Sequence, residues 1–403
     1  MPLLVLALPA SAQLEPPENP EIAPPPLQYN FAPPGARSLA MGASFIGLAD
    51  DATASESNPA GLTALTKPEF SAHLRYSEFD NTAPNTVTGS GFETFTTRLG
   101  SPSFFSVVYP WRKAAFSLYY QRAADYRANS IFRDFLSESF YNDDTVQVRF
   151  RAENIGASAA FKLGDKISIG GSIRATRVHL DSLQEVTLVF PLSSDIPARF
   201  VNTANIESTE TKVTFNAGIL VTPTPKLSLG GVYKKGADLD FAATAQNTAD
   251  AAEIGPLRSP VATGTIRVTV PDVLGGGIAI KPTDRFTILA DVVLIQYSQA
   301  DLGAEQQNGY QAFGEGGREA LEDGTEIHGG VEYTWTQGND WIFSVRGGYY
   351  FDPDHDGLAG LDSDQNHVTF GGGVVVKGKL QVDVAANIAD AIKEGLISFV
   401  VRF

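Results

Sequence analysis

The chain has 403 residues, of which 46 are acidic, 30 are basic and none is cysteine, so its formal net charge is −16. The lack of cysteine excludes disulfides and thiolate metal sites. The acidic balance argues against nucleic acid as a partner, which needs clustered lysine and arginine, and it suits surface loops that must stay soluble.

The first residues indicate export. The apolar run at residues 3–8, followed by small residues up to Ala12, is typical of a signal peptide and its cleavage site. We therefore interpret residues 1–12 as the remnant of a signal peptide. Residues 13–34 are rich in proline and predict an extended segment.

Residues 35–67 are rich in glycine, alanine, serine and aspartate and lack the alternation of a strand. They suit a compact plug, or hatch, and a flexible periplasmic leader is the alternative. No part of the chain approaches the roughly 18 uninterrupted apolar residues of a membrane-spanning helix.

From residue 68 to the end, apolar and polar residues alternate along about fourteen strand-like segments. Short connections such as residues 163–166 are followed by long ones such as 127–143 and 182–208. This rhythm is typical of barrels of the bacterial outer membrane, which have short periplasmic turns and long outside loops. An open sheet edge would leave backbone groups unsatisfied in lipid, so the sheet has to close.

The sequence therefore predicts an all-β membrane protein in the bacterial outer membrane. We expect a 14-stranded antiparallel transmembrane β-barrel over residues 68–403, with the hatch of residues 35–67 inside its lumen. Pro271 interrupts one of the strand-like segments and predicts an irregularity in the wall.

The ends of the strands carry aromatic residues. Trp111, Trp335 and Trp341 lie beside short turns, where a periplasmic aromatic girdle is expected. The last strand is amphipathic and ends at Phe403, with Phe399 on the same face. A terminal aromatic on such a strand resembles the recognition signal of the barrel assembly machinery, which we expect as a partner.

Two stretches carry a family resemblance: the pattern GARSLAMG at residues 35–42 and the pattern NPAGL that begins with Asn58, Pro59 and Ala60. Both resemble the hatch of the FadL/TodX family, outer-membrane transporters of long-chain fatty acids and other hydrophobic compounds. The resemblance implies a monomer that captures its ligand on outside loops and passes it to an internal pocket. It also implies sideways release through a gap near a kinked third strand, here residues 113–126.

Strand alternation predicts that Arg149, Arg151 and Arg174 point toward the lumen, where they can hold a carboxylate head group. The alternative is a set of ion pairs that support the hatch. Phe190 and Phe200 lie in a stretch that is unusually apolar for an outside loop, and such a patch often marks a binding site. The alternative there is an extension of the strands above the membrane.

Three aspartates, Asp352, Asp354 and Asp356, match the first half of a calcium loop that continues to Gly357. The twelfth position is Ser363 instead of glutamate, so an ordinary acidic turn is the alternative. The histidines have neither metal-ligand spacing nor a recognisable triad, and nothing indicates a cofactor, so we do not expect an enzyme.

Three functions remain. Uptake of a hydrophobic small molecule or a fatty acid is favoured, with lipid of the outer membrane as the surrounding partner. The second is a scaffold or shuttle of a secretion system, similar to the PorV type. The third is a general diffusion porin, which an intact hatch would block.

Overall fold

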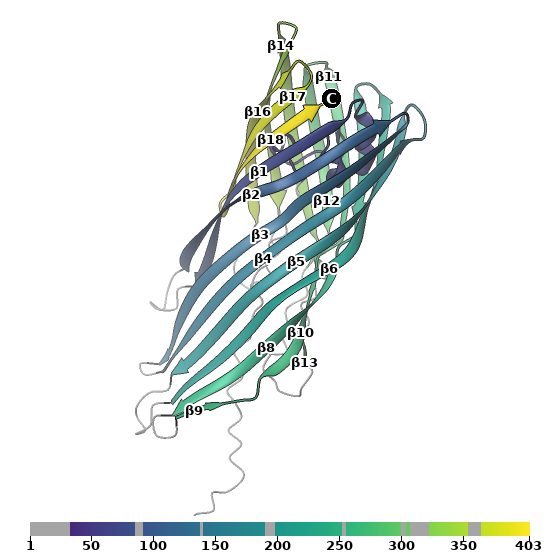
Figure 1. The fold of residues 1–403 in the computed structure, drawn as a ribbon. Coiled ribbons are helices and arrows are strands. Elements are labelled where there is room, and N and C mark those ends of the chain that lie inside the picture. Colours follow the sequence, from purple (N-terminus) through teal and green to yellow (C-terminus); the bar gives the residue numbers. More distant parts are fainter. Residues whose placement is uncertain are drawn as a thin grey trace, which may run out of the picture.

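A closed and strongly tilted cylinder of antiparallel strands surrounds residues 35–67 in the computed structural model (Figure 1). The structure describes residues 33–84, 92–137, 140–189, 198–251, 255–299, 304–306, 322–353 and 364–403. Within these ranges, no helix combines the length and the apolar character needed to cross a bilayer.

The described residues form 18 strands in one sheet, with four short helices. The strands are β1 (Glu69–Pro84), β2 (Phe92–Trp111), β3 (Ala114–Ser137), β4 (Phe140–Lys162), β5 (Ile167–Val189), β6 (Ala198–Thr224), β7 (Leu227–Lys234), β8 (Asp238–Ala251), β9 (Gly255–Arg258), β10 (Ala262–Thr269), β11 (Val273–Thr283), β12 (Phe286–Ile295), β13 (Ala304–Gln306), β14 (Gly324–Gln337), β15 (Trp341–Asp352), β16 (Gln365–Val376), β17 (Leu380–Ile388) and β18 (Ile392–Arg402). The helices are α1 (Ala36–Leu39), α2 (Ala54–Ser57), η1 (Pro59–Ala64) and η2 (Tyr297–Gln299).

These strands make fourteen crossings of the wall. β7 and β8 are two halves of one crossing, and β10 and β11 are two halves of the next. The short strands β9 and β13 pair with β8 and β10 beyond these crossings. β1 pairs with both β2 and β18, which closes the cylinder. The predicted 14-stranded antiparallel barrel is therefore confirmed.

Several strands continue well past the predicted crossings. β3 ends at Ser137 and β4 begins at Phe140, while β5 ends at Val189 and β6 begins at Ala198. The expected long connections in these regions are therefore largely strand. Pairing between strands satisfies backbone groups above the bilayer as well as inside it.

The outer surface of the barrel carries the apolar side chains that face lipid. Leu118 of β3, Ile155 of β4 and Ile173 of β5 are 65–67% exposed. In β18, Phe399 is exposed between the buried residues Ser398 and Val400. This alternation agrees with the amphipathic last strand expected from the sequence, whereas recognition of Phe403 by the assembly machinery stays a prediction.

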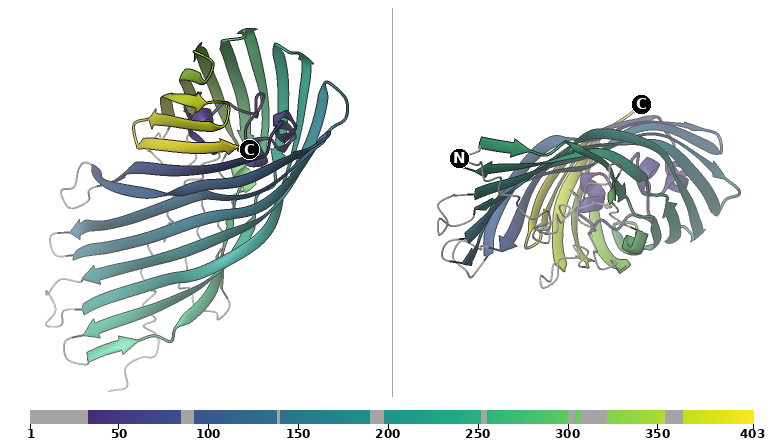
Figure 2. Two further views of the ribbon diagram at one scale, coloured as in Figure 1. Left: turned by 45° about the horizontal axis from the view of Figure 1, so that its top comes forward. Right: turned by 90° about the horizontal axis from the view of Figure 1, so that it is seen from below.

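Residues 35–67, called the hatch segment below, lie inside the barrel (Figure 2). Met41, Phe45 and Leu62 of this segment are fully buried, in one core with Val108 and Leu289 of the wall. The segment packs its backbone directly against glycines of the wall. A Cβ atom at Gly230 would lie 2.0 Å from the Ile46 carbonyl oxygen, and one at Gly330 would lie 2.1 Å from that of Met41.

Candidate functional site

The Asn58-Pro59-Ala60 motif joins the hatch segment to the wall. The buried Asn58 amide donates hydrogen bonds to the carbonyl oxygens of Ile46 (3.0 Å) and Ile219 (3.1 Å). Its Oδ1 accepts from the Ala60 backbone amide (3.2 Å) and so caps η1. A Cβ at Gly218 would lie 2.1 Å from Asn58 Oδ1. The motif therefore fits only against a wall position without a side chain.

A buried carboxylate of the hatch segment, Glu56, is bound by four wall side chains. Its Oε1 pairs with Arg174 (2.9 Å) and Lys234 (3.3 Å). Its Oε2 accepts hydrogen bonds from the Tyr119 hydroxyl (3.0 Å) and the Asn216 amide (3.1 Å). These partners come from β3, β5, β6 and β7, so one side chain ties α2 to a third of the wall.

The charge state of Glu56 follows from its partners. Burial alone would raise the pKa of Glu56, but the charges of Arg174 and Lys234 and the Tyr119 hydroxyl hold that pKa below its ordinary value. The carboxylate is therefore ionised, and its ion pairs are complete, at neutral pH.

A second buried network holds the start of the hatch segment. Arg37 of α1 donates two hydrogen bonds to Glu332 (3.0 and 3.1 Å) and also pairs with Asp50. Glu332 accepts from Arg346 (2.6 Å), which in turn donates to Asp383 (2.8 Å). A buried charge without a partner is costly, so each residue of this network requires the oppositely charged residue beside it.

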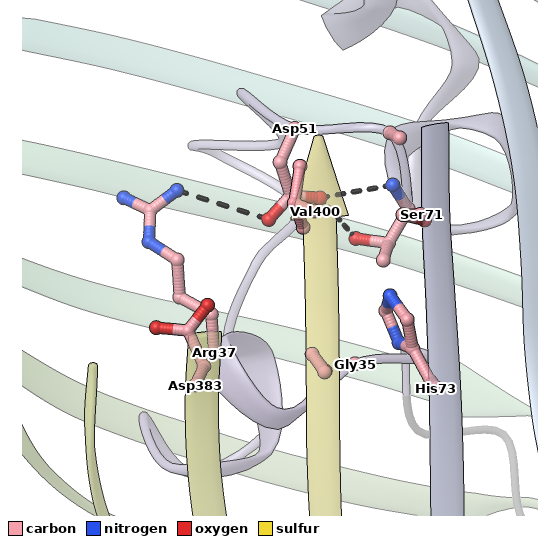
Figure 3. Close-up of a pocket in the computed structure, with 10 residues that line it drawn as sticks. Gly35, Arg37, Asp51, Ser71, His73, Asp383 and Val400 are labelled. Atoms are coloured by element: carbon pink, nitrogen blue, oxygen red, sulfur yellow. Dashed lines mark hydrogen bonds and ion pairs between the residues drawn. The ribbon is translucent and has the colours of Figure 1, made fainter. Parts of the chain in front are cut away.

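A small polar pocket separates the hatch segment from strands β1, β17 and β18 (Figure 3). Arg37 and Asp51 pair across it (3.8 Å), and burial raises the pKa of Asp51. The ring of His73 points into the pocket from β1. The pocket has a volume of only about 10 Å³, whereas sites for organic ligands hold some ~300–1,000 Å³. It is therefore part of the seal around the hatch segment and too small for a hydrophobic ligand.

The three predicted arginines do not come together. Arg174 faces the lumen, but one of its N–H groups binds Glu56, and two others donate to Thr214 and to the Lys235 carbonyl oxygen. Arg149 and Arg151 lie on the opposite face of β4 from the buried residues Phe150 and Ala152, and so point outward. The prediction that these two face the lumen was wrong, because outside the bilayer the apolar face of β4 is the inner one.

Of the other residues predicted to bind a ligand or calcium, the structure describes only Phe200 and Asp352. Phe200 pairs with Leu188 where β6 meets β5, so this part of the expected loop is strand. Asp352 ends β15. Phe190, Asp354 and Asp356 lie outside the described residues. In the part of the chain that the structure describes, no cluster of three potential metal ligands occurs.

The lumen face carries an apolar cluster that the sequence did not predict. Phe150 of β4, Val178 of β5 and Phe241 of β8 are fully buried and belong to one group of contacting side chains. We call it the apolar lumen cluster, and its buried members are Val148, Phe150, Ala152, Val178, Leu180, Ala237, Leu239, Phe241 and Val268. Because β4 and β8 are not neighbours in the sheet, these side chains meet across the lumen.

The apolar lumen cluster depends on a break in two adjacent crossings. The buried residues of β7 are Val232 and Lys234, whereas those of β8 are odd-numbered, beginning with Leu239. The intervening residues 235–237 shift the alternation, so that Leu239 and Phe241 turn inward. The adjacent crossing, formed by β10 and β11, breaks at Pro271, as the sequence predicted. The two breaks lie against each other, because a Cβ at Gly236 would lie 1.8 Å from the Val270 carbonyl oxygen.

A second irregularity lies between β2 and β3. Their ladder ends at the pair Phe104 and Gln121, although both strands continue further out. Ser103 has no paired residue where β2 meets β1, and Ala123 has none where β3 meets β4, so each is the extra residue of a bulge. Bulges bend strands and interrupt pairing. The third strand is therefore irregular at the place where the resemblance led us to expect a kink.

The fold and the lumen together define a barrel of the bacterial outer membrane whose bore is occupied by its own N-terminal segment. The family model described as outer membrane protein transport protein (OMPP1/FadL/TodX) matches residues 35–394. The chain belongs to this family and is an outer-membrane transporter of hydrophobic compounds.

Solved structures of low sequence identity share the fold. The toluene transporter TodX of P. putida is 17% identical, covers 93% of this chain and 99% of its own length, and has a TM-score of 0.69. A FadL homologue of Pseudomonas aeruginosa is 15% identical over 91% and 97% of the two chains, with a TM-score of 0.67. The toluene transporter TbuX of Ralstonia pickettii is 17% identical over 93% and 99%, with a TM-score of 0.63. The search of curated proteins gave no match.

Proposed function

We propose that this transporter receives a hydrophobic small molecule on its outside loops, binds it at the apolar lumen cluster and releases it sideways into the bilayer. The apolar lumen cluster is the observation that carries the proposal. Barrel lumens are ordinarily polar, so a group of buried apolar residues there needs an explanation. The side chains of the cluster cover one another, so a ligand has to part them and replace their mutual contacts, and each Å² of its own apolar area removed from water contributes about 25 cal/mol.

Uptake tests the role of the cluster. Phe241→Asn places an amide in the apolar lumen cluster, whereas Ala242→Asn places the same amide on the exposed outer face of β8. We expect Phe241→Asn to lower uptake of labelled toluene and oleate in cells by about five- to 150-fold, since an unpaired buried amide costs about 1–3 kcal/mol. Equal uptake by both variants and the parent protein would remove the support for the proposal.

The end of the β2–β3 ladder supports sideways release. Beyond Phe104 and Gln121 the wall lacks the regular pairing seen elsewhere, and Tyr119 of the same strand binds Glu56 of the hatch segment. This opening lies at the outer end of the apolar band, next to Arg122, so a ligand leaving here would enter the outer leaflet beside its head groups and regain apolar surroundings over a short path.

A cysteine pair tests the exit, because the chain has no cysteine of its own. Ser103→Cys with Ala123→Cys, joined by a cleavable thiol cross-linker, should stop uptake, and cleavage should restore it. The control pair is Ala157→Cys with Ile173→Cys, which lie opposite each other within the regular β4–β5 ladder. Uptake that persists through the cross-linked first pair would contradict sideways release at this place.

The position of Lys212 supports a proposal about the kind of ligand. It lies opposite Thr176 on the inner face of β6, close to the apolar lumen cluster. We propose that Lys212 binds the carboxylate of a fatty acid by a charge-assisted hydrogen bond. Lys212→Gln should then weaken oleate binding and leave toluene binding unchanged, and an equal effect on both ligands would rule out a role in carboxylate recognition.

A further inference from the structure

On the outer surface of β3, β4 and β5, an arginine follows a lipid-facing apolar residue after one intervening outward residue on each strand. Leu118, Ile155 and Ile173 face lipid. Further out on the same faces lie five arginines, accompanied by the acidic residues Asp125, Glu153 and Asp181. These arginines are Arg122, Arg127, Arg149, Arg151 and Arg177. The patch therefore carries an excess of two positive charges on a chain whose net charge is −16.

The height of this patch matches the outer boundary of the bilayer. On β4 the lipid-facing stretch begins after Lys162, at the short turn, and ends before Glu153. The nine residue steps from Lys162 to Glu153 cover about 30 Å at about 3.3 Å per residue. With a strand tilt of about 40° this stretch spans about 23 Å along the membrane normal, close to the apolar band of about 25 Å in such barrels.

The protein neutralises only part of the positive charge of the patch. Arg122 forms ion pairs with both Glu153 (3.1 Å) and Asp125 (3.4 Å). Arg151 is left at 3.7 Å from Asp125, beyond hydrogen-bond distance.

Arg127 and Arg149 lie directly opposite each other on neighbouring strands. Like charges in that position destabilise a sheet. The Nε atom of Arg149 is buried without an acceptor. Among the described residues, neither of these two arginines nor the exposed Arg177 has an ion pair, although Asp181 lies opposite Arg149 and Glu153 lies opposite Arg177 in the ladder.

We infer that Arg149, Arg151 and Arg177 bind the phosphate groups of a phosphorylated glycolipid in the outer leaflet. The guanidinium group binds phosphate through two parallel hydrogen bonds. An anion from the membrane supplies the charge that the opposed arginines lack. The apolar band directly below would hold the acyl chains of the same molecule, so a lipid fits the surface better than free phosphate does.

The test compares two triple variants of the purified protein in detergent. The first is Arg149→Gln, Arg151→Gln and Arg177→Gln. The control is Arg98→Gln, Arg267→Gln and Lys393→Gln, which removes three outward cations that are already paired with Glu78 or Asp240. Binding of diphosphoryl lipid A and of its dephosphorylated form is measured by native mass spectrometry, and the heat-dependent gel shift of folded barrels verifies folding.

The first variant should bind diphosphoryl lipid A about 100-fold more weakly than the parent protein, at about fivefold for each arginine near a membrane surface. The control should stay within about threefold, as exposed and paired charges contribute little. Uptake of toluene should be the same in all three proteins. Equal losses in both variants, equal binding of the dephosphorylated lipid, or no binding by the parent protein would each overturn the inference.

Discussion

The substitution Glu56→Gln isolates the charge that fixes the hatch segment in the lumen. Glutamine has the same shape and can still bond Tyr119 and Asn216, but it leaves Arg174 and Lys234 buried without a counter-charge. Breaking a buried pair on one side costs about 3–5 kcal/mol. Arg174 keeps its bonds to Thr214 and to the Lys235 carbonyl, so we expect the lower end, about 3 kcal/mol.

A loss of about 3 kcal/mol raises the population of the undocked hatch segment by a factor of about 150. Hydrogen–deuterium exchange measures that population, because amides exchange when they open locally. Amides around α2 and η1 should lose protection by about this factor, while amides of β14 to β17 keep theirs. The matched control is Glu78→Gln, which removes a carboxylate from the outer face of β1, where it pairs with exposed Arg98 and Lys393.

The reasoning would be refuted by unchanged exchange in the hatch segment of Glu56→Gln. It would also be refuted by a uniform loss of protection over the whole barrel. The first result would mean that the buried ion pairs contribute nothing to docking, and the second that they act on the stability of the wall instead.

Two further predictions use a spin label at Ala64→Cys, an exposed end of η1. Because the folded pKa of Glu56 is lowered, its docking contribution is complete above the unfolded pKa of about 4.3 and is lost as the pH falls through the lower folded value. In the parent protein with this label, the label should therefore become mobile only in that acidic range. In Glu56→Gln the label should be mobile already at pH 7. A mobility transition with the same midpoint pH in both proteins would contradict the assignment of this transition to Glu56. Gly218→Ala should also mobilise the label, at about 1–3 kcal/mol, since its Cβ would clash with Asn58, whereas Gly276→Ala has open space and should not. Equal spectra for the two alanine variants would show that the close approach at Gly218 is not needed.

The barrel could be predicted from the sequence because the bilayer imposes one rule on every crossing. Side chains that face lipid are apolar, and the pleat sends their neighbours inward. Arg174 obeys the rule, as it lies on the crossing itself. Arg149 and Arg151 do not, because they lie on the extension of β4 beyond the bilayer, where the outer face meets polar groups.

The partners inside the lumen could not be predicted. The hatch segment consists of turns and helices of four to six residues, too short for a periodic pattern that would fix which face meets which strand. Nothing in the sequence therefore links Glu56 to Arg174, 118 positions away. The apolar lumen cluster was hidden for a different reason: residues 235–237 shift the alternation, and only Pro271 in the neighbouring crossing signals the break.

The glycines that receive the hatch segment have a consequence for ion leakage. At Gly170, Gly218, Gly230 and Gly330 the wall has no side chains of its own to fill the space. Backbone atoms of the hatch segment take their place at three of these glycines, and the Asn58 side chain does so at Gly218. Complete withdrawal of that segment would leave an aqueous bore with electrical conductance. If the envelope is to stay tight to ions and detergents, we therefore expect the segment to yield only locally, one anchor at a time, whenever it moves.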